Sequence, residues 1–170
     1  MLKSMVMAAL LVAGAATPGF AQHYAGVKGG LLNITQDIDF DGGAMVGVLF
    51  GYDMPGDNFS LEGEFNASVV SAESDNERYG DLDIWTLAAY GAFRTSGTFY
   101  FKGKAGLLYE ELKSSVSGSS IEIQVDGGEM ALSLGIGAGL RLGENLGAEL
   151  EYTQIEADIG YATLGLNWMF

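Results

Sequence analysis

The side chains of this sequence that are best able to do chemistry are charged residues in pairs spaced two apart. These pairs are Glu62 and Glu64, Lys102 and Lys104, and Glu149 and Glu151. In a β-strand, a spacing of two puts both members of a pair on the same face. Paired carboxylates can carry out acid–base catalysis. Carboxylates that face amines can instead neutralise them, and the sequence favours this structural interpretation.

The charged pairs lie at matching distances from turns. Residues 56–65 match residues 143–152 in register, and the lysine pair follows a third turn near residue 97. The three pairs should therefore lie at equal heights. Lys28 should reach a similar level, while Arg94 and Arg141 should sit lower, near the turns. We predict that these nine residues form a layer of opposite charges inside a closed barrel. Losing one partner would cost roughly 3–5 kcal/mol if the layer is dry.

Alternation of apolar and polar residues places these charges on strands. It predicts eight strands near residues 23–34, 43–53, 58–70, 83–94, 98–112, 129–142, 145–155 and 158–170. Their connections alternate between short and long, as in membrane barrels. The predicted fold is therefore all-β, an eight-stranded antiparallel up-and-down transmembrane β-barrel, with the apolar face toward lipid and the charges inside.

A soluble barrel with its apolar face inward is the open alternative for the same pattern. It would leave Gly135, Gly137 and Gly139 on the outside, where small residues have no evident purpose. In a narrow membrane barrel the same glycines face inward and make room for long charged side chains.

The amino-terminal residues predict export from the cytoplasm. A cationic start at Lys3 precedes an apolar run over residues 5–16, and small residues follow at Gly19 and Ala21. This pattern is typical of a signal peptide over residues 1–21, which leaves residues 22–170 as the barrel domain. An uncleaved anchor helix is the alternative. The sequence contains no cysteine, which excludes a lipoprotein anchor and disulfide bonds.

The carboxyl-terminal strand carries a family resemblance. Its alternate residues are apolar: Ala162, Leu164, Leu166, Trp168 and Phe170. Together with the matching units at 56–65 and 143–152, this strand resembles the small eight-stranded outer-membrane barrels of the OmpA/OmpX type. The resemblance implies a place in the outer membrane of a Gram-negative cell envelope, with outer-membrane lipid and lipopolysaccharide as partners. It also implies that Trp168 and Phe170 are an assembly signal read by the barrel assembly machinery.

The acidic composition bears on partners and metals. The formal net charge of −14 excludes nucleic acid as a partner. Asp37, Asp39 and Asp41 match the first half of a calcium-binding loop, but the position that should supply a bidentate glutamate holds Val48. We therefore expect an acidic outer loop with at most a weak calcium site, and no cofactor.

Catalysis has few candidate residues. Lipid A-modifying barrels of similar size rely on histidine with serine and an acidic residue, yet the single histidine, His23, lies beside the predicted cleavage site. The serines between residues 114 and 120 have no imidazole partner. We therefore expect no enzyme but an outer-membrane protein with a structural or surface-interaction role. The strand-like alternation of residues 121–125 fits either a binding edge or a segment that only stiffens a long loop. The alternatives are a narrow porin-like ion channel and, third, a lipid A-modifying enzyme.

Overall fold

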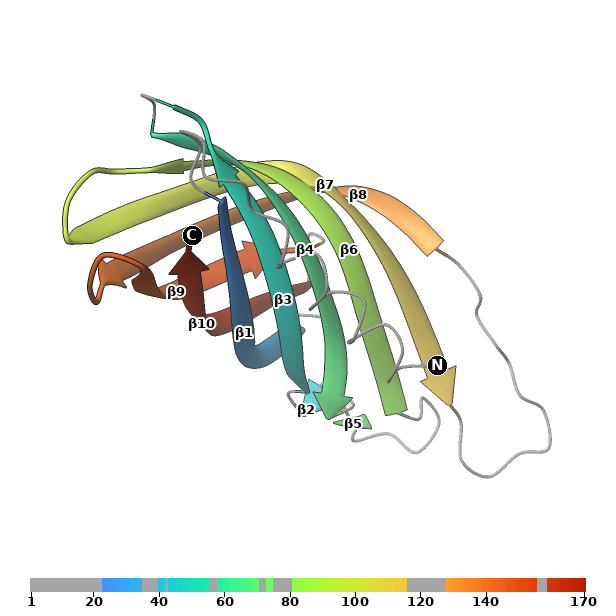
Figure 1. Cartoon of the computed structure of the whole chain (residues 1–170). Coiled ribbons are helices and arrows are strands. Elements are labelled where there is room, and N and C mark those ends of the chain that lie inside the picture. The colour runs from blue at the N-terminus through green and yellow to red at the C-terminus, as the bar shows by residue number, and fades with distance from the viewer. Residues whose placement is uncertain are drawn as a thin grey trace.

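The alternating segments form a closed antiparallel barrel (Figure 1). The computed structural model describes residues 23–34, 40–41, 43–55, 58–70, 73–74, 81–115, 128–155 and 159–170. Eight described strands close the barrel in the order β1-β10-β9-β8-β7-β6-β4-β3, which confirms the predicted architecture. Their bounds are β1 His23–Ile34, β3 Ala44–Asp53, β4 Phe59–Val70, β6 Asp81–Arg94, β7 Phe99–Ser115, β8 Gly128–Arg141, β9 Leu146–Gln154 and β10 Ile159–Met169.

The strands are strongly tilted, as the register shows. A path that starts at Arg141 on β8 and steps to the paired residue on each next strand returns to β8 at Ala131, ten residues earlier in the sequence. The path runs through Gly147, Asn167, Gly26, Leu49, Glu64, Ala88 and Leu108. This stagger over eight strands corresponds to a tilt of about 40°. Such a barrel is narrow enough for side chains to fill its interior.

The two ends of the barrel differ. At one end, which we call the turn end, short connections follow β3, β6 and β8, and the backbone N–H of Phe170 donates to the carbonyl of His23 at 2.9 Å. At the other end, the loop end, long segments follow β1, β4 and β7. The connection from β9 to β10 is tight, because the N–H of Ile155 donates to the carbonyl of Ile159 at 2.8 Å.

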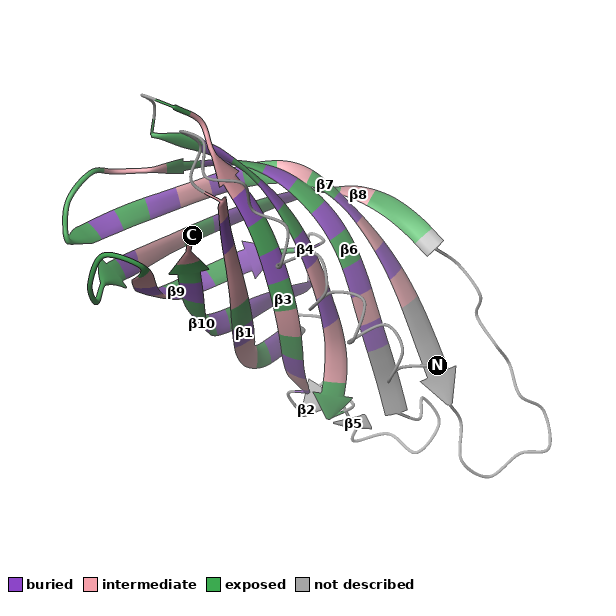
Figure 2. Ribbon diagram, viewed as in Figure 1, coloured by how far each residue is buried: buried purple, intermediate pink, exposed green. Residues whose placement is uncertain are grey.

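Alternate residues along each strand face opposite environments, and Figure 2 shows this as bands of buried and exposed colour. On β8 the exposed row includes Leu132, Leu134 and Ile136, while Ser133 and Gly135 are buried. Outward aromatic rings gather in two groups. Phe59 and Phe93 contact each other near the turn end, and Trp85 contacts Phe65 and Tyr109 nearer the loop end. The outer surface is thus an apolar band between two rows of rings, as lipid requires.

Some elements differ from the predicted ones. β7 continues to Ser115, three residues beyond the predicted end, because it pairs with β6 as far as Asp81. Two short strands, β2 (Phe40–Asp41) and β5 (Glu73–Ser74), pair with each other in segments predicted as loops. Among the described residues, no helical segment has the length and apolarity of a membrane span.

Candidate functional site

The barrel interior holds a network of ion pairs that draws on five strands. Each member stands at an inward position because the residues beside it belong to the apolar outward row. Lys28 comes from β1, Glu62 and Glu64 from β4, Arg94 from β6, Lys102 and Lys104 from β7, and Glu149 and Glu151 from β9. All are buried except Arg94, which is slightly exposed and lies nearest the turn end.

The part of the network further from the turn end is centred on Lys104. Its ammonium lies 2.6 Å from an oxygen of Glu64 and 2.6 Å from an oxygen of Glu151. Lys28 forms ion pairs with the same two carboxylates. On β8 a Cβ at Gly135 would lie 2.6 Å from Cε of Lys104, so the lysine occupies the space that the glycine leaves.

The part nearer the turn end is centred on Lys102 and Arg94. The Lys102 ammonium lies 2.9 Å from Glu62, 3.2 Å from Glu149 and 2.8 Å from Glu151, and therefore links both parts of the network. Arg94 forms an ion pair with Glu62 and donates to Glu149 at 3.0 Å. The remaining guanidinium nitrogen of Arg94 donates to the hydroxyls of Tyr24 and Ser60, each at 2.8 Å.

This geometry suits charge neutralisation better than catalysis. The four cations of the network face the four buried carboxylates of Glu62, Glu64, Glu149 and Glu151, so these formal charges cancel, and the partly exposed Asp53 adds a longer ion pair to Arg94 at 3.8 Å. Oxygens of Glu62, Glu64 and Glu151 lie within 4.8 Å of one another, which is close enough to hold a metal ion. The ammonium groups of Lys28, Lys102 and Lys104 already lie among these oxygens. A cation would therefore meet like charges, and the residues do not fit a metal site.

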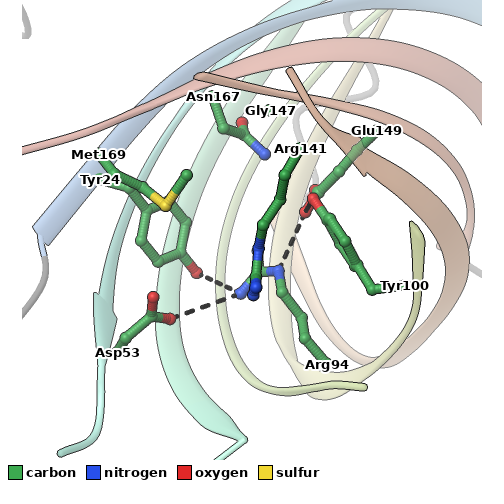
Figure 3. A pocket seen from close by; sticks show the side chains of 9 residues that line it. All are labelled: Tyr24, Asp53, Arg94, Tyr100, Arg141, Gly147, Glu149, Asn167 and Met169. Carbon is green, nitrogen blue, oxygen red and sulfur yellow. Dashed lines mark hydrogen bonds and ion pairs between the residues drawn. The ribbon is translucent and has the colours of Figure 1, made fainter. Parts of the chain in front are cut away.

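The ninth predicted member, Arg141, lies elsewhere. It is exposed at the turn end, its guanidinium sits 5.6 Å from the centre of the Tyr100 ring, and no described carboxylate forms an ion pair with it. Figure 3 shows Arg141 and Arg94 on a cavity of about 30 Å³ whose other lining includes Asp53 and Asn167. This volume accommodates one or two water molecules. The prediction that Arg141 belongs to the charge layer differs from the structure because β8 ends there, and little of the barrel wall extends beyond it.

An apolar cluster fills the interior near the loop end, and sequence analysis missed it. We call this cluster the apolar plug. It comprises Leu32, Met45, Ile84, Ala88, Tyr90, Leu108, Ile155, Ile159 and Tyr161. Its members come from β1, β3, β6, β7, β10 and the residue that follows β9, and Leu108, Ile155 and Tyr161 are fully buried. The available signal was confined to some strands: inward residues change from Lys28 to Leu32 along β1 and from Glu151 on β9 to Ile155 just after it, whereas on β7 the charged Glu110 follows Leu108.

The other predicted residues are placed as follows. His23 packs its ring against Phe50, Tyr52 and Phe170, and no described serine or carboxylate hydrogen-bonds to that ring. Trp168 and Phe170 are exposed on the outer surface at the turn end. Asp37, Asp39 and residues 116–127 lie outside the described residues, and Asp41 is described only as backbone of β2.

Comparisons with known proteins agree with this geometry. Residues 5–170 match the family model of the outer membrane protein beta-barrel domain. No curated protein matches the sequence significantly.

Three solved structures illustrate the similarity in fold. Neisserial surface protein A (NspA) shares 14% identity over 87% of this chain and 97% of its own, with a TM-score of 0.63. Ail, the attachment invasion locus protein of Yersinia pestis, shares 16% sequence identity over 89% of this chain and 100% of its own, with a TM-score of 0.62. The amino-terminal barrel domain of Pseudomonas aeruginosa OprF shares 14% sequence identity over 88% of this chain and 99% of its own, with a TM-score of 0.57.

Proposed function

Because the chain belongs to the outer membrane protein beta-barrel domain family, we propose that this integral outer-membrane barrel acts in surface interaction. In this proposal the lumen stays closed and the loop end faces the cell exterior. The observation that carries the proposal is a sheet that extends beyond the rest of the barrel wall at the loop end. The partner is an extended protein segment that adds to the edge of this sheet.

The extended sheet is formed by β6, β7 and β8. The β6–β7 ladder continues to the pair Asp81–Ser115, whereas the ladder between β4 and β6 stops at Trp85. On the other side β8 stays paired with β7 as far as Gly128, whereas β9 stops opposite Leu134. Residues 81–84, 111–115 and 128–133 therefore rise above their neighbours, and we call them the projecting sheet.

The β8 side of the projecting sheet is the better binding edge. Ser133 closes the β8–β9 ladder by donating from its hydroxyl to the carbonyl of Gln154 at 2.6 Å. Beyond it, no described strand pairs with this side of residues 128–132. Met130, which pairs with Tyr109 at the level of the loop-end rings, is 66% exposed. An unpaired strand edge with an apolar side chain beside it is a template for another strand.

Charge indicates what kind of segment would bind. Glu129 is exposed on the projecting sheet, and the whole chain has a formal net charge of −14. Ail, which has a similar fold, was solved in complex with a heparin analogue, sucrose octasulfate, which is a polyanion. The acidic surface of this chain would repel such a ligand. An extended segment with alternating basic and apolar residues is the complementary partner.

A binding experiment with a defined peptide tests the proposal. The probe is a peptide of alternating lysine and valine, and the matched control peptide alternates glutamate and valine. We expect folded protein to bind the lysine peptide, and Glu129→Lys to weaken that binding at least severalfold. Glu144→Lys changes an exposed glutamate at the turn end and serves as the control variant. Equal binding of both peptides, or equal effects of both variants, would contradict the proposal.

The two alternatives have separate tests. A narrow channel would give steady ion-selective steps in planar-bilayer recordings of the folded protein, and we expect none, because the ion-pair network and the apolar plug fill the lumen. A lipid A-modifying enzyme would change the mass of lipid A on incubation. If that change occurred, His23→Ala should abolish it, but the packing of His23 against Phe50 and Tyr52 at the turn end argues against such a role.

A further inference from the structure

We propose that two chemically different seals close the lumen in series, so that opening either one alone leaves the barrel impermeable to ions. The first seal is the ion-pair network, and the second is the apolar plug. The inference rests on the closed lumen of the proposed function and adds which residues close it. A rearrangement of the charges alone would then be insufficient for conduction.

The ion-pair network is one complete barrier. Side chains of Lys102, Lys104 and Glu64 are at most 1% exposed, so no continuous water column passes them. An ion that entered from the turn end would find the cavity beside Arg94 and Arg141 and would then meet the paired side chains. Passage requires at least one ion pair to separate, which is costly in a site without water.

The apolar plug is a barrier of another kind. Leu108, Ile155 and Tyr161 are completely buried, and Leu32, Met45 and Ile84 are nearly so. Moving an ion through such surroundings without compensating partners costs many times the thermal energy. The nine plug residues carry no charge, and the inward carboxyl of Glu110 lies two residues past Leu108, on the loop-end side. Ion-pair exchange in the network below therefore creates no path between the plug side chains.

The two seals meet at Tyr161, which belongs to both. Its ring is part of the apolar plug, while its hydroxyl lies 3.4 Å from the Lys28 ammonium, 3.1 Å from the Asn66 amide nitrogen and 3.3 Å from Glu64. Variants that test the seals separately should therefore leave Tyr161 and its partners intact. Lys102 with Glu149 on one side, and Leu108 with Ile155 on the other, meet this requirement because none of them hydrogen-bonds to the Tyr161 hydroxyl.

Planar-bilayer recordings of four proteins test the inference. They are the unchanged protein, the charge-pair variant (Lys102→Ser with Glu149→Ser), the plug variant (Leu108→Ala with Ile155→Ala) and the combination of all four changes. The charge-pair variant removes one cation and one carboxylate, so the network stays neutral. We expect steady conductance steps from the combination only.

Each outcome has a distinct meaning. Steps from the unchanged protein would contradict the closed lumen, and with it the proposed function. Steps from the charge-pair variant alone would overturn only the serial arrangement, because the apolar plug would not be a barrier. If the variant with all four changes gave no conductance steps, the serial arrangement would also be overturned, since removing both seals should open a path.

Thiol accessibility provides a second readout that does not require a wide pore. Because the chain has no cysteine, one introduced cysteine is the only reactive thiol. We expect Asp53→Cys at the cavity to react readily with a small charged thiol reagent. We expect Ala88→Cys within the plug to stay protected in both the unchanged and the charge-pair backgrounds, and to react once the plug variant is added. Reaction of Ala88→Cys in the charge-pair background would overturn the inference.

Discussion

The ring of Tyr24 on β1 occupies the space where Gly51 on β3 would carry a side chain. A Cβ built on Gly51 would overlap the ring and hydroxyl of Tyr24. The same hydroxyl donates to Glu62 at 2.7 Å and accepts from Arg94 at 2.8 Å. The missing side chain at Gly51 therefore lets an aromatic ring position the turn-end part of the ion-pair network.

We expect Gly51→Ala to destabilise the barrel, because the new methyl group must displace Tyr24 and disturb its contacts with Glu62 and Arg94. Overpacking of this kind costs about 1–3 kcal/mol. The measurement is the free energy of unfolding in urea, with the protein in detergent micelles or vesicles.

The matched control for this variant is Gly103→Ala. A Cβ at Gly103 would have no heavy atom within 4 Å, and the residue faces outward on β7. Because both changes replace a strand glycine with alanine, their difference isolates the clash. Gly103→Ala should leave stability unchanged or raise it by up to about 1 kcal/mol. An equal loss in both variants would show that backbone effects, and not the Tyr24 ring, control the result.

The ion-pair network predicts a strong effect of removing Lys102. Lys102→Ala leaves Glu62, Glu149 and Glu151 without a cation that each now contacts within 3.2 Å. We expect a loss of about 3–5 kcal/mol, because the remaining buried carboxylates become undercompensated. The urea midpoint of unfolding reports this loss, provided that the slope of the transition is unchanged.

Arg141→Ala is the control for the loss of a positive charge. Arg141 is exposed and has no described ion-pair partner, so its removal changes net charge by the same amount without leaving a buried carboxylate. We expect a change of at most about 1 kcal/mol, from the lost contact with the Tyr100 ring. A loss from Arg141→Ala as large as that from Lys102→Ala would attribute the effect to overall charge.

The orientation of the barrel wall was predictable from the sequence because a strand repeats every two residues. Rows such as Leu132, Leu134 and Ile136 identify an outward face without any tertiary contact. The distance of Glu62, Lys102 and Glu149 from their turns indicates their heights, because hairpin pairing is local. The ion pairs across the barrel interior join these three residues, because Lys102 contacts both Glu62 and Glu149.

The apolar plug was not predictable in the same way. Around Leu108 the sequence runs Leu107-Leu108-Tyr109, with no alternation to separate the inward residue from the outward ones. The projecting sheet was also missed, because its length depends on the pairing of β7 with β6 and on where β9 stops. These are relations between strands, and no single segment contains them.

A charged side chain placed on the outward face should destabilise the barrel by an amount that depends on its depth in the lipid. Leu150 is exposed in the middle of β9, whereas Leu142 is exposed in the turn after β8. Leu150→Arg should cost about 2–4 kcal/mol, and Leu142→Arg about 0–1 kcal/mol, because lipid solvates a cation poorly at mid-depth and better at its edge. Unfolding in lipid vesicles measures both. Equal penalties at the two positions would place the lipid boundary elsewhere.

The terminal residues predict a separation between assembly and stability. The backbone N–H of Phe170 bonds to His23, and their ring centroids lie 6.4 Å apart, so the terminus closes the β1–β10 seam at the turn end. If Trp168 and Phe170 are also an assembly signal, Phe170→Ala should lower the amount of barrel assembled in the outer membrane of living cells. Refolding from urea into detergent needs no assembly machinery and should change little.

Phe99→Ala supplies the comparison for the terminal residue. Phe99 is another exposed outward aromatic at the turn end, at the start of β7 and away from the chain terminus. Loss of the Phe99 ring should weaken contact with lipid without altering recognition of the chain by the barrel assembly machinery. We therefore expect Phe170→Ala to reduce the heat-modifiable, folded band in isolated outer membranes much more than Phe99→Ala does. If the two variants reduced that band equally, or if Phe170→Ala failed to refold in detergent, the terminal ring would act in packing and not in recognition.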